Sequence, residues 1–399
     1  MSPSLRERVL VWAPAILAAI LALWLGSADV FWAGDFIDEA YPAYIGLQRE
    51  GWDTFLDRLP GYSGFTILIG APSALVAESQ GWLDTGMYRL TALPGVALLI
   101  LLGARLAAYA RNITDANGWW LIAALGAGGP IGYQTILYGH PEDLLAGAAA
   151  VLAVLAALSN RPTAAAALLL AGVLAKQWAV LAILPAVLAA PTGRVRILLV
   201  AGGGAAAIVA FQLLVLQGAS GTMVNTGGLF HPHAIWWPFG IDAPAAFTAA
   251  GHGELTAPAW LQPLTRPILM GTALAVTVAW WLRRGRDTAG NPDVLALLAL
   301  VFALRCALDP WNLVYYHLPL ALALLAYETR RGADWPVLTL AVTALCWLSF
   351  VTYDARTGMG PFLVYFAWMG PLVAHLGVQL FGAPRRRASL VRAPLPSTG

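Results

Sequence analysis

The feature that most constrains this chain is a series of long apolar runs that contain almost no charged residues. A membrane-spanning helix needs roughly 20 apolar residues, and about twelve runs approach that length, some with only about 14 or 15. The chain is 59% hydrophobic and only 11% charged, with a mean hydropathy of +0.69. A soluble core cannot bury this much apolar surface. The sequence therefore predicts an all-α polytopic membrane protein, a bundle of about twelve transmembrane helices.

The shorter runs are expected to be tilted, broken or re-entrant. One stretch, 163–190, forms either a single long helix or a tight pair that pivots at Lys176-Gln177. The predicted spans lie near 9–28, 89–110, 119–138, 143–158, 163–176, 177–190, 197–217, 266–283, 294–308, 313–327, 336–352 and 361–381.

The distribution of arginine predicts the topology, because basic residues favour cytoplasmic loops. With the N-terminus inside and the spans alternating, the inside segments hold 16 of the 23 basic residues. They are Arg6, Arg8, Arg105, Arg111, Arg161, Arg194, Arg196, Arg283, Arg284, Arg286, Arg330, Arg331, Arg385, Arg386, Arg387 and Arg392. We therefore expect a multi-pass protein of the cell membrane with both termini in the cytoplasm.

Residues 1–382 are expected to form one transmembrane domain, followed by a basic, disordered cytoplasmic tail at 383–399. The domain has two long extracytoplasmic loops, 28–88 and 218–265. Within the first loop, 65–76 is apolar but too short to span, so we expect it to lie in the membrane interface.

Three acidic residues, Asp35, Asp38 and Glu39, follow the first predicted span directly. Transfer of a sugar to a hydroxyl needs a carboxylate that accepts the proton of the acceptor. A second carboxylate orients the first or holds a divalent cation, Mg²⁺ or Mn²⁺. The alternative is an acidic outer loop that only reflects topology.

This segment resembles the first-loop Asp-Glu motif of the GT-C glycosyltransferase superfamily. The resemblance rests on one span before the motif, a long first outer loop, many later spans and the residues Asp38-Glu39-Ala40-Tyr41-Pro42-Ala43-Tyr44 with Gly51-Trp52. It implies a GT-C-like bundle that uses polyprenyl-phosphate sugars. It also implies that Asp38 is the catalytic base, with Asp35 as the competitor, because Gly34-Asp35-Phe36 resembles the pattern of the glycosyltransferase 87-like branch.

Two further candidates lie on the same predicted face of the membrane. Between the third and fourth spans lie His140, Glu142 and Asp143. These residues either bind an acceptor or a metal, or they only stabilise the N-terminus of a helix. Lys176 is the only lysine of the chain and interrupts an apolar run. A buried ammonium needs an anion, which is either a lipid-linked phosphate or Glu142 and Asp143.

Arg305 and His317 complete the predicted donor site. Arg305 either binds the donor phosphate, for which a guanidinium is well shaped, or pairs with Asp309 four residues later. His317 follows Tyr315 and Tyr316 and is either a packing residue of its span or a functional residue that binds the phosphate or helps the base.

The second outer loop carries His231 and His233 next to Trp236 and Trp237. Two histidines without a clear third ligand are weak evidence for a metal site, so we interpret this segment as loop structure. Cys306 and Cys346 fall in apolar runs and predict no disulfide framework.

These features predict an extracytoplasmic membrane glycosyltransferase that moves a sugar from a polyprenyl-phosphate donor to a hydroxyl of a glycan, glycolipid or protein. A composition typical of a high-GC bacterium favours mannose or arabinose. The partners are the donor, the acceptor and the lipid bilayer, without nucleic acid. The interpretation expects Asp38, Lys176, Arg305 and His317 to line one cavity. The rival interpretation is a polytopic transporter or lipid-linked sugar flippase that uses the same charges for passage.

Overall fold

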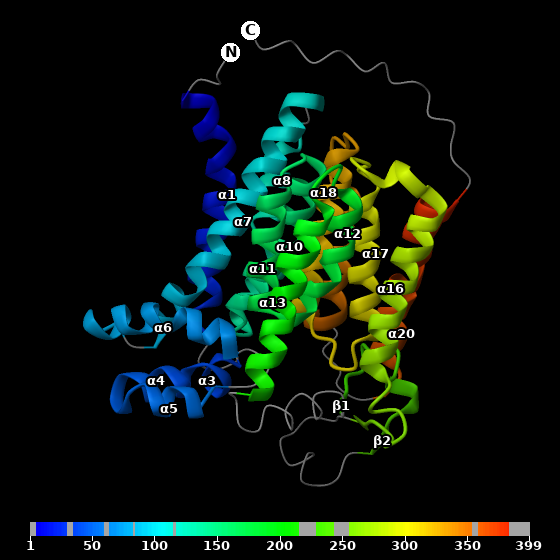
Figure 1. The fold of residues 1–399 in the computed structure, drawn as a ribbon. Coiled ribbons are helices and arrows are strands. Elements are labelled where there is room, and N and C mark those ends of the chain that lie inside the picture. The colour runs from blue at the N-terminus through cyan, green and yellow to red at the C-terminus, as the bar shows by residue number, and fades with distance from the viewer. Residues whose placement is uncertain are drawn as a thin grey trace.

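The computed structural model describes residues 5–29, 35–59, 64–82, 84–114, 117–214, 229–242, 255–352 and 358–382. The predicted tail 383–399 lies outside these residues, as do the parts 215–228 and 243–254 in and beside the second outer loop. The described chain is mostly helical, as predicted, and its long helices run side by side in a bundle (Figure 1).

Five helices are long and apolar enough to cross a membrane. They are α1 (Leu5–Gly26), α7 (Thr85–Thr114), α10 (Pro141–Leu158), α13 (Arg194–Leu214) and α20 (Gly360–Phe381). The α16 helix (Thr265–Arg284) is as long but less apolar. The coarse prediction of a helical membrane protein is therefore supported, and the count of twelve spans stays a prediction.

The remaining predicted spans are shorter helices, several of them interrupted. The range 119–138 divides into α8 (Trp119–Gly126) and α9 (Gly129–Leu137), which meet at Gly128 with φ +104°. The others are α11 (Pro162–Ala175), η1 (Gln177–Ala182), α12 (Ile183–Ala189), η3 (Gly285–Thr288), α17 (Val294–Leu308), η4 (Val314–His317), α18 (Leu318–Arg330), α19 (Val337–Trp347) and the π-helical turn η5 (Leu348–Thr352).

The stretch 163–190 is a tight pair and not one long helix. Lys176 has an extended backbone, with φ −145° and ψ 128°, which ends α11. The chain then returns along α11, because Thr192 donates a hydrogen bond to Asn160 at 2.7 Å, next to the start of α11. The lysine therefore stands at the turn between two antiparallel segments.

The helices of the first loop lie at one end of the bundle, which we call the first-loop end. They are α3 (Phe36–Glu39), α4 (Tyr41–Glu50), α5 (Trp52–Asp57) and α6 (Gly64–Ser79). In Figure 1, α4, α5 and α6 run across the direction of the long helices. This placement of α6 agrees with the prediction that the apolar segment 65–76 does not span.

The start of α1 and the end of α20 lie at the opposite end, which we call the tail end (Figure 1). There Arg283 at the end of α16 donates a hydrogen bond to the carbonyl of Gly382 at 2.9 Å. The two ends of the described chain thus share one face of the bundle, and which face is cytoplasmic stays a prediction.

The second outer loop forms a small unit of its own at the first-loop end. Its strands β1 (Leu229–Phe230), β2 (Ile241–Asp242) and β3 (Leu255–Thr256) pair antiparallel in the order β1-β3-β2, with the turn η2 (Trp237–Phe239) between β1 and β2. Both predicted loop tryptophans are buried. The indole of Trp236 donates to the carbonyl of Leu308 at 2.7 Å, and that of Trp237 to the carbonyl of Gly358 at 3.0 Å. These contacts confirm that the tryptophans build the loop.

Small residues let α7 and α10 approach closely, which brings the start of α10 beneath the first loop. A Cβ added at Gly95 in α7 would lie 2.9 Å from the carbonyl oxygen of Pro141 and 2.9 Å from the Cβ of Leu144. Close packing of this kind holds helices together where lipid removes the hydrophobic driving force between them.

Candidate functional site

The first-loop helix α3 docks on the turn between α9 and α10. The backbone N–H of Asp35 donates to the carbonyl of Tyr138 at 2.9 Å. Gly139 has φ +81°, and a Cβ added there would lie 2.6 Å from the backbone nitrogen of Phe36. Glycine is therefore required twice, for its left-handed backbone and for the close approach. This contact places Asp35 next to His140.

His140 bridges two acidic residues that are far apart in the sequence. Its Nε2 lies 3.0 Å from Oδ2 of Asp35, and its Nδ1 lies 2.9 Å from Oε1 of Glu142. The ring also lies against Tyr315, with centroids 4.3 Å apart. Burial and the charge of Lys176 lower the pKa of His140, but the hydrogen bonds to Asp35 and Glu142 outweigh them and raise it to about 10. The imidazole is therefore protonated at neutral pH and donates from both nitrogens.

Lys176 extends the same network. Its Nζ lies 3.0 Å from Oε1 of Glu142 and 3.4 Å from Oδ2 of Asp143. Asp143 also accepts a hydrogen bond from the indole of Trp178 at 2.9 Å. The hydroxyl of Thr66 in α6 donates to the carbonyl of Ala175 at 2.6 Å, which satisfies the backbone where α11 ends. Of the two predicted partners of the lysine, the carboxylates are the ones in contact.

Arg305 stands next to this network, between two aromatic rings. Its Cζ lies 4.5 Å from the ring centroid of Trp178 and 4.4 Å from that of Tyr316, and its Nη1 donates to the carbonyl of Tyr316 at 3.0 Å. Among the described residues, no ion pair within 4.0 Å involves this guanidinium.

Arg305 and Asp309 form no ion pair within 4.0 Å, although their charges lie near enough to interact. The α17 helix ends at Leu308, and Asp309 has an extended backbone with φ −71° and ψ 125°. The backbone N–H of Asp309 still donates to the carbonyl of Arg305 at 2.8 Å, and the chain leaves the helix after this residue. The carboxylate of Asp309 instead accepts the backbone N–H of Trp311 at 3.2 Å.

His317 belongs to a separate buried group. Its Nε2 lies 2.9 Å from the hydroxyl of Tyr365, and its Nδ1 lies 3.2 Å from the carbonyl of Val314. His233 lies in the same group, stacked on Phe350 with centroids 3.9 Å apart. Burial lowers the pKa of His233 to about 4, so that this side chain is neutral at physiological pH. These histidines join the second loop to the bundle.

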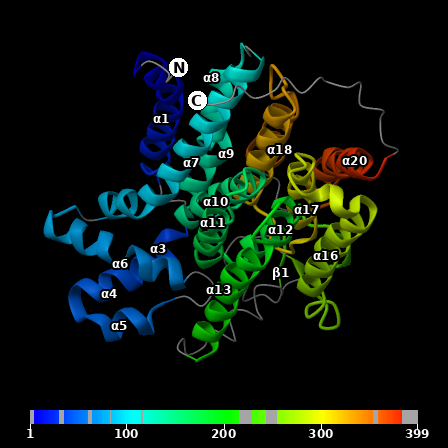
Figure 2. The same cartoon turned by 45° about the horizontal axis from the view of Figure 1, so that its top comes forward.

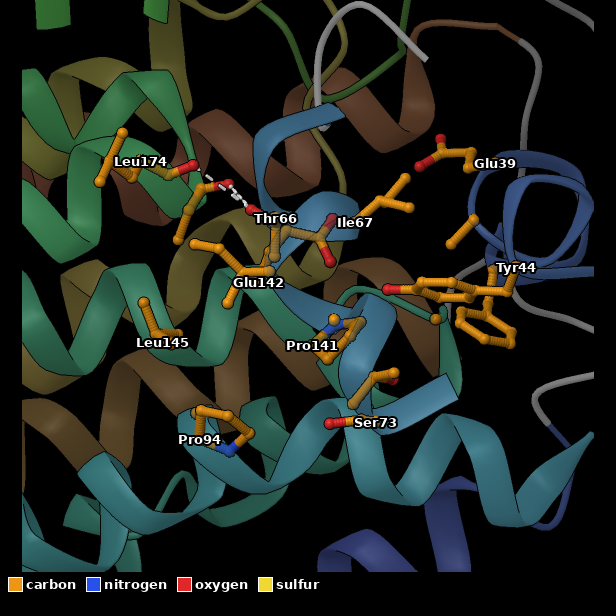
Figure 3. A pocket seen from close by; sticks show the side chains of 18 of the residues that line it. Glu39, Tyr44, Thr66, Ile67, Ser73, Pro94, Pro141, Glu142, Leu145 and Leu174 are labelled. Carbon is orange, nitrogen blue, oxygen red and sulfur yellow. Dashed lines mark hydrogen bonds between the residues drawn. The ribbon is translucent and has the colours of Figure 1, made fainter. Parts of the chain in front are cut away.

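A cavity of about 270 Å³ lies between the first-loop helices and the bundle (Figure 3). Its lining comes from α3, α4 and α6 on one side and from α7, α10 and α11 on the other. The lining is mostly apolar, with the carboxylates of Glu39 and Glu142 and the hydroxyls of Tyr44, Thr66, Ser73 and Thr91. Figure 3 shows Glu39 and Tyr44 projecting from the first loop toward the side where Thr66 and Pro141 lie.

The lining of this cavity differs from the one that the sequence predicted. Asp38, Lys176, Arg305 and His317 are all absent from the lining of this cavity, and Asp38 is exposed on α3. Glu39 lines the cavity instead, because α3 presents its neighbouring residues to different sides. A carboxylate oxygen of Glu39 also lies within 4.8 Å of the ligand atoms of Asp35 and His140.

Two groups have the composition of a cation site, Asp35 with Glu39 and His140, and His140 with Glu142 and Asp143. Both depend on His140, whose two nitrogens are engaged with carboxylates. A protonated imidazole has no lone pair for a metal. A divalent cation would have to displace the proton of His140, and metal binding by these residues stays a prediction.

Three contributors to the site were missed by the sequence analysis. Tyr44 stood inside a quoted motif and Trp178 directly follows Lys176-Gln177, but their roles as a cavity hydroxyl and an indole donor depend on which helices meet. Thr66 gave no signal at all, because its partner lies more than a hundred residues away, at Ala175.

No family model matches the sequence, and no curated protein or solved structure is similar to it. The resemblance to GT-C glycosyltransferases therefore rests on the first-loop residues and their arrangement alone.

Proposed function

We propose that this protein is a membrane glycosyltransferase that moves a sugar from a polyprenyl-phosphate donor to an acceptor hydroxyl. The observation that carries the proposal is the convergence of charged groups from α3, α10, the α11 turn and α17 beside an apolar cavity. Each ionisable group at membrane depth costs several kcal/mol, so a cluster of them in so apolar a chain indicates a functional site.

We assign the general base to Glu39. Its carboxylate lines the cavity, whereas Asp38 is exposed and Asp35 is held by His140. In the proposed step, Glu39 accepts the proton of the acceptor hydroxyl while the oxygen attacks the anomeric carbon. The bond from that carbon to the phosphate oxygen breaks, the lipid phosphate leaves, and the anomeric centre inverts.

We assign the donor phosphate to Arg305. Lys176 is already balanced by Glu142 and Asp143, whereas Arg305 has no carboxylate within 4.0 Å among the described residues and its Nε has no acceptor. The rings of Trp178 and Tyr316 hold the guanidinium plane, which suits bidentate binding of a phosphate. Lys176 then orients Glu142 and Asp143, and His317 has a structural role.

The test is transfer of labelled mannose or arabinose from the polyprenyl-phosphate donor in proteoliposomes. We expect Glu39→Gln to lower the rate by about 10²- to 10⁴-fold, as for loss of a general base. Arg305→Gln should raise the KM for the donor, and Asp38→Asn serves as the matched first-loop control with near-normal transfer.

Normal transfer by Glu39→Gln and Arg305→Gln would overturn the assignments. A wild-type protein that moves the intact donor across the bilayer without breaking its glycosidic bond would favour the transporter or flippase instead.

A further inference from the structure

We infer that the cavity of Figure 3 binds the acceptor, and that this acceptor is an alcohol attached to a lipid, such as a glycolipid. The inference rests on the proposed function and names its acceptor class. It follows from the charge of the cavity, from the depth of its rim and from its size.

The polar groups of the lining suit a hydroxyl and not a phosphate. Glu39 and Glu142 contribute carboxylates, and the described residues that line the cavity include no lysine or arginine. Carboxylates accept hydrogen bonds from hydroxyls but repel a phosphodiester. Burial raises the pKa of Tyr44, so its phenol stays neutral and adds a further donor and acceptor. The donor phosphate therefore belongs with Arg305, outside this cavity.

The rim of the cavity faces the lipid side of the bundle. Ile69 of α6 is 54% exposed, and Pro94 of α7 is also exposed, yet both line the cavity. Pro94 lies about 13 Å along the axis from the start of α7, at 1.5 Å per residue. Since α7 is apolar enough to span, this side of the rim lies at the depth of the acyl chains. A ligand that enters there carries an apolar chain.

The size of the cavity limits what it encloses. At about 270 Å³ it is at the lower end of small-ligand sites. It accommodates a headgroup hydroxyl and the first carbons of a chain, which pack on Leu145 and Leu174. A folded protein acceptor does not fit this space.

The experiment compares two acceptors with the same sugar, octyl α-mannopyranoside and methyl α-mannopyranoside, in proteoliposomes that contain the polyprenyl-phosphate donor. We expect the octyl compound to be preferred. Ala171→Phe, which fills the cavity from α11, should raise the KM for the octyl acceptor by about tenfold and leave the KM for the donor unchanged. Ala275→Phe, on the exposed surface of α16, is the matched control without effect.

A second variant and a direct binding readout guard against a folding defect. Ile69→Gln changes an exposed rim residue and should raise the octyl KM by about threefold. Octyl mannoside with a diazirine in its chain should label peptides that contain Leu145 or Leu174 in the wild type, and Ala171→Phe should prevent that labelling.

Equal KM values for the two acceptors, or labelling away from the cavity, would overturn this assignment while leaving the transferase proposal intact. A rise in the donor KM for Ala171→Phe would place the donor chain in the cavity instead. Labelling of the cavity without any sugar transfer would support the lipid-alcohol site and refute the transferase.

Discussion

At the first-loop end of the bundle, four carboxylates gather around two cations, whereas at the tail end one carboxylate pairs with two arginines. Asp35, Glu39, Glu142 and Asp143 surround His140 and Lys176. At the tail end, Oδ2 and Oδ1 of Asp293 lie 3.4 Å from Arg284 and 3.3 Å from Arg331.

The two clusters also differ in their access to water (Figure 2 shows the helices that carry them). The Lys176 side chain is 13% exposed and its partners Glu142 and Asp143 less, whereas at the tail end Asp293 is buried but its partners Arg284 and Arg331 are 26% and 45% exposed. Exposed pairs gain little because water and salt screen them, while buried charges cost much unless they are paired. We conclude that screening by water limits the tail-end ion pairs, whereas the buried charges of the first-loop cluster depend on one another.

The largest expected effect is that of Lys176→Met, which leaves Glu142 and Asp143 buried without their common cation. We expect a loss of about 3–5 kcal/mol in stability, seen as a lower midpoint of thermal denaturation in nanodiscs. Lys176→Arg should lose less, because it keeps the charge. Adding Glu142→Gln to Lys176→Met should restore part of the loss, and an unchanged midpoint in Lys176→Met would refute the contrast between the two ends.

The next effect is a pH dependence that comes from His140. The native state holds the proton up to a pKa of about 10, whereas the unfolded chain releases it near 6.5. The contribution of this ion pair to stability is therefore complete below pH 6.5 and is lost as the pH rises toward 10, by a few kcal/mol.

This loss is read as the difference in denaturation midpoint between wild type and His140→Gln across that pH range. The glutamine variant carries no titrating ring, so the gap between the two proteins should narrow as the pH rises. A constant gap would mean that His140 is not charged in the native state.

Gly139→Ala should cause a smaller loss of stability. Gly285→Ala at the tail end serves as its reference, because it measures the cost of backbone strain alone. Both glycines have positive φ, +81° and +56°. A Cβ at Gly285 meets nothing within 4 Å, whereas a Cβ at Gly139 meets the backbone of Phe36. We expect about 1 kcal/mol for Gly285→Ala from backbone strain and about 2–3 kcal/mol for Gly139→Ala.

Gly139→Ala should also slow transfer, because it displaces α3 and with it Glu39. Equal losses of stability in the two glycine variants, with normal transfer, would show that the docking of α3 on Gly139 is unimportant.

The smallest effect is expected for Asp293→Asn at the tail end. Because Arg284 and Arg331 are partly exposed, the loss should be about 1 kcal/mol, with sugar transfer unchanged. Calorimetry in nanodiscs at two salt concentrations measures it, since the loss should shrink at high salt. A loss as large as that of Lys176→Met would remove the distinction drawn between the two clusters.

Sequence reasoning predicted much of the helical framework, and it named most of the residues that meet at the first-loop end. Asp35, His140, Glu142, Asp143 and Lys176 could be selected because each charge stands out in an apolar chain. Direct contact of Arg305 with Asp309 was not predictable, because the guanidinium packs on Trp178 and Tyr316 and the Asp309 carboxylate accepts the backbone N–H of Trp311.

The amino-acid sequence alone is enough to predict a helical chain that is apolar enough to cross a membrane and carries costly charges near the ends of its helices. Hydropathy is a sum over neighbouring residues, so a linear reading captures it. The packing of the helices was needed to show that His140 joins Asp35 to Glu142, that no described carboxylate lies within 4.0 Å of Arg305 and that Glu39, not Asp38, faces the cavity. Those outcomes depend on which helices pack together and on the rotation of each about its axis, quantities that a one-dimensional pattern leaves open.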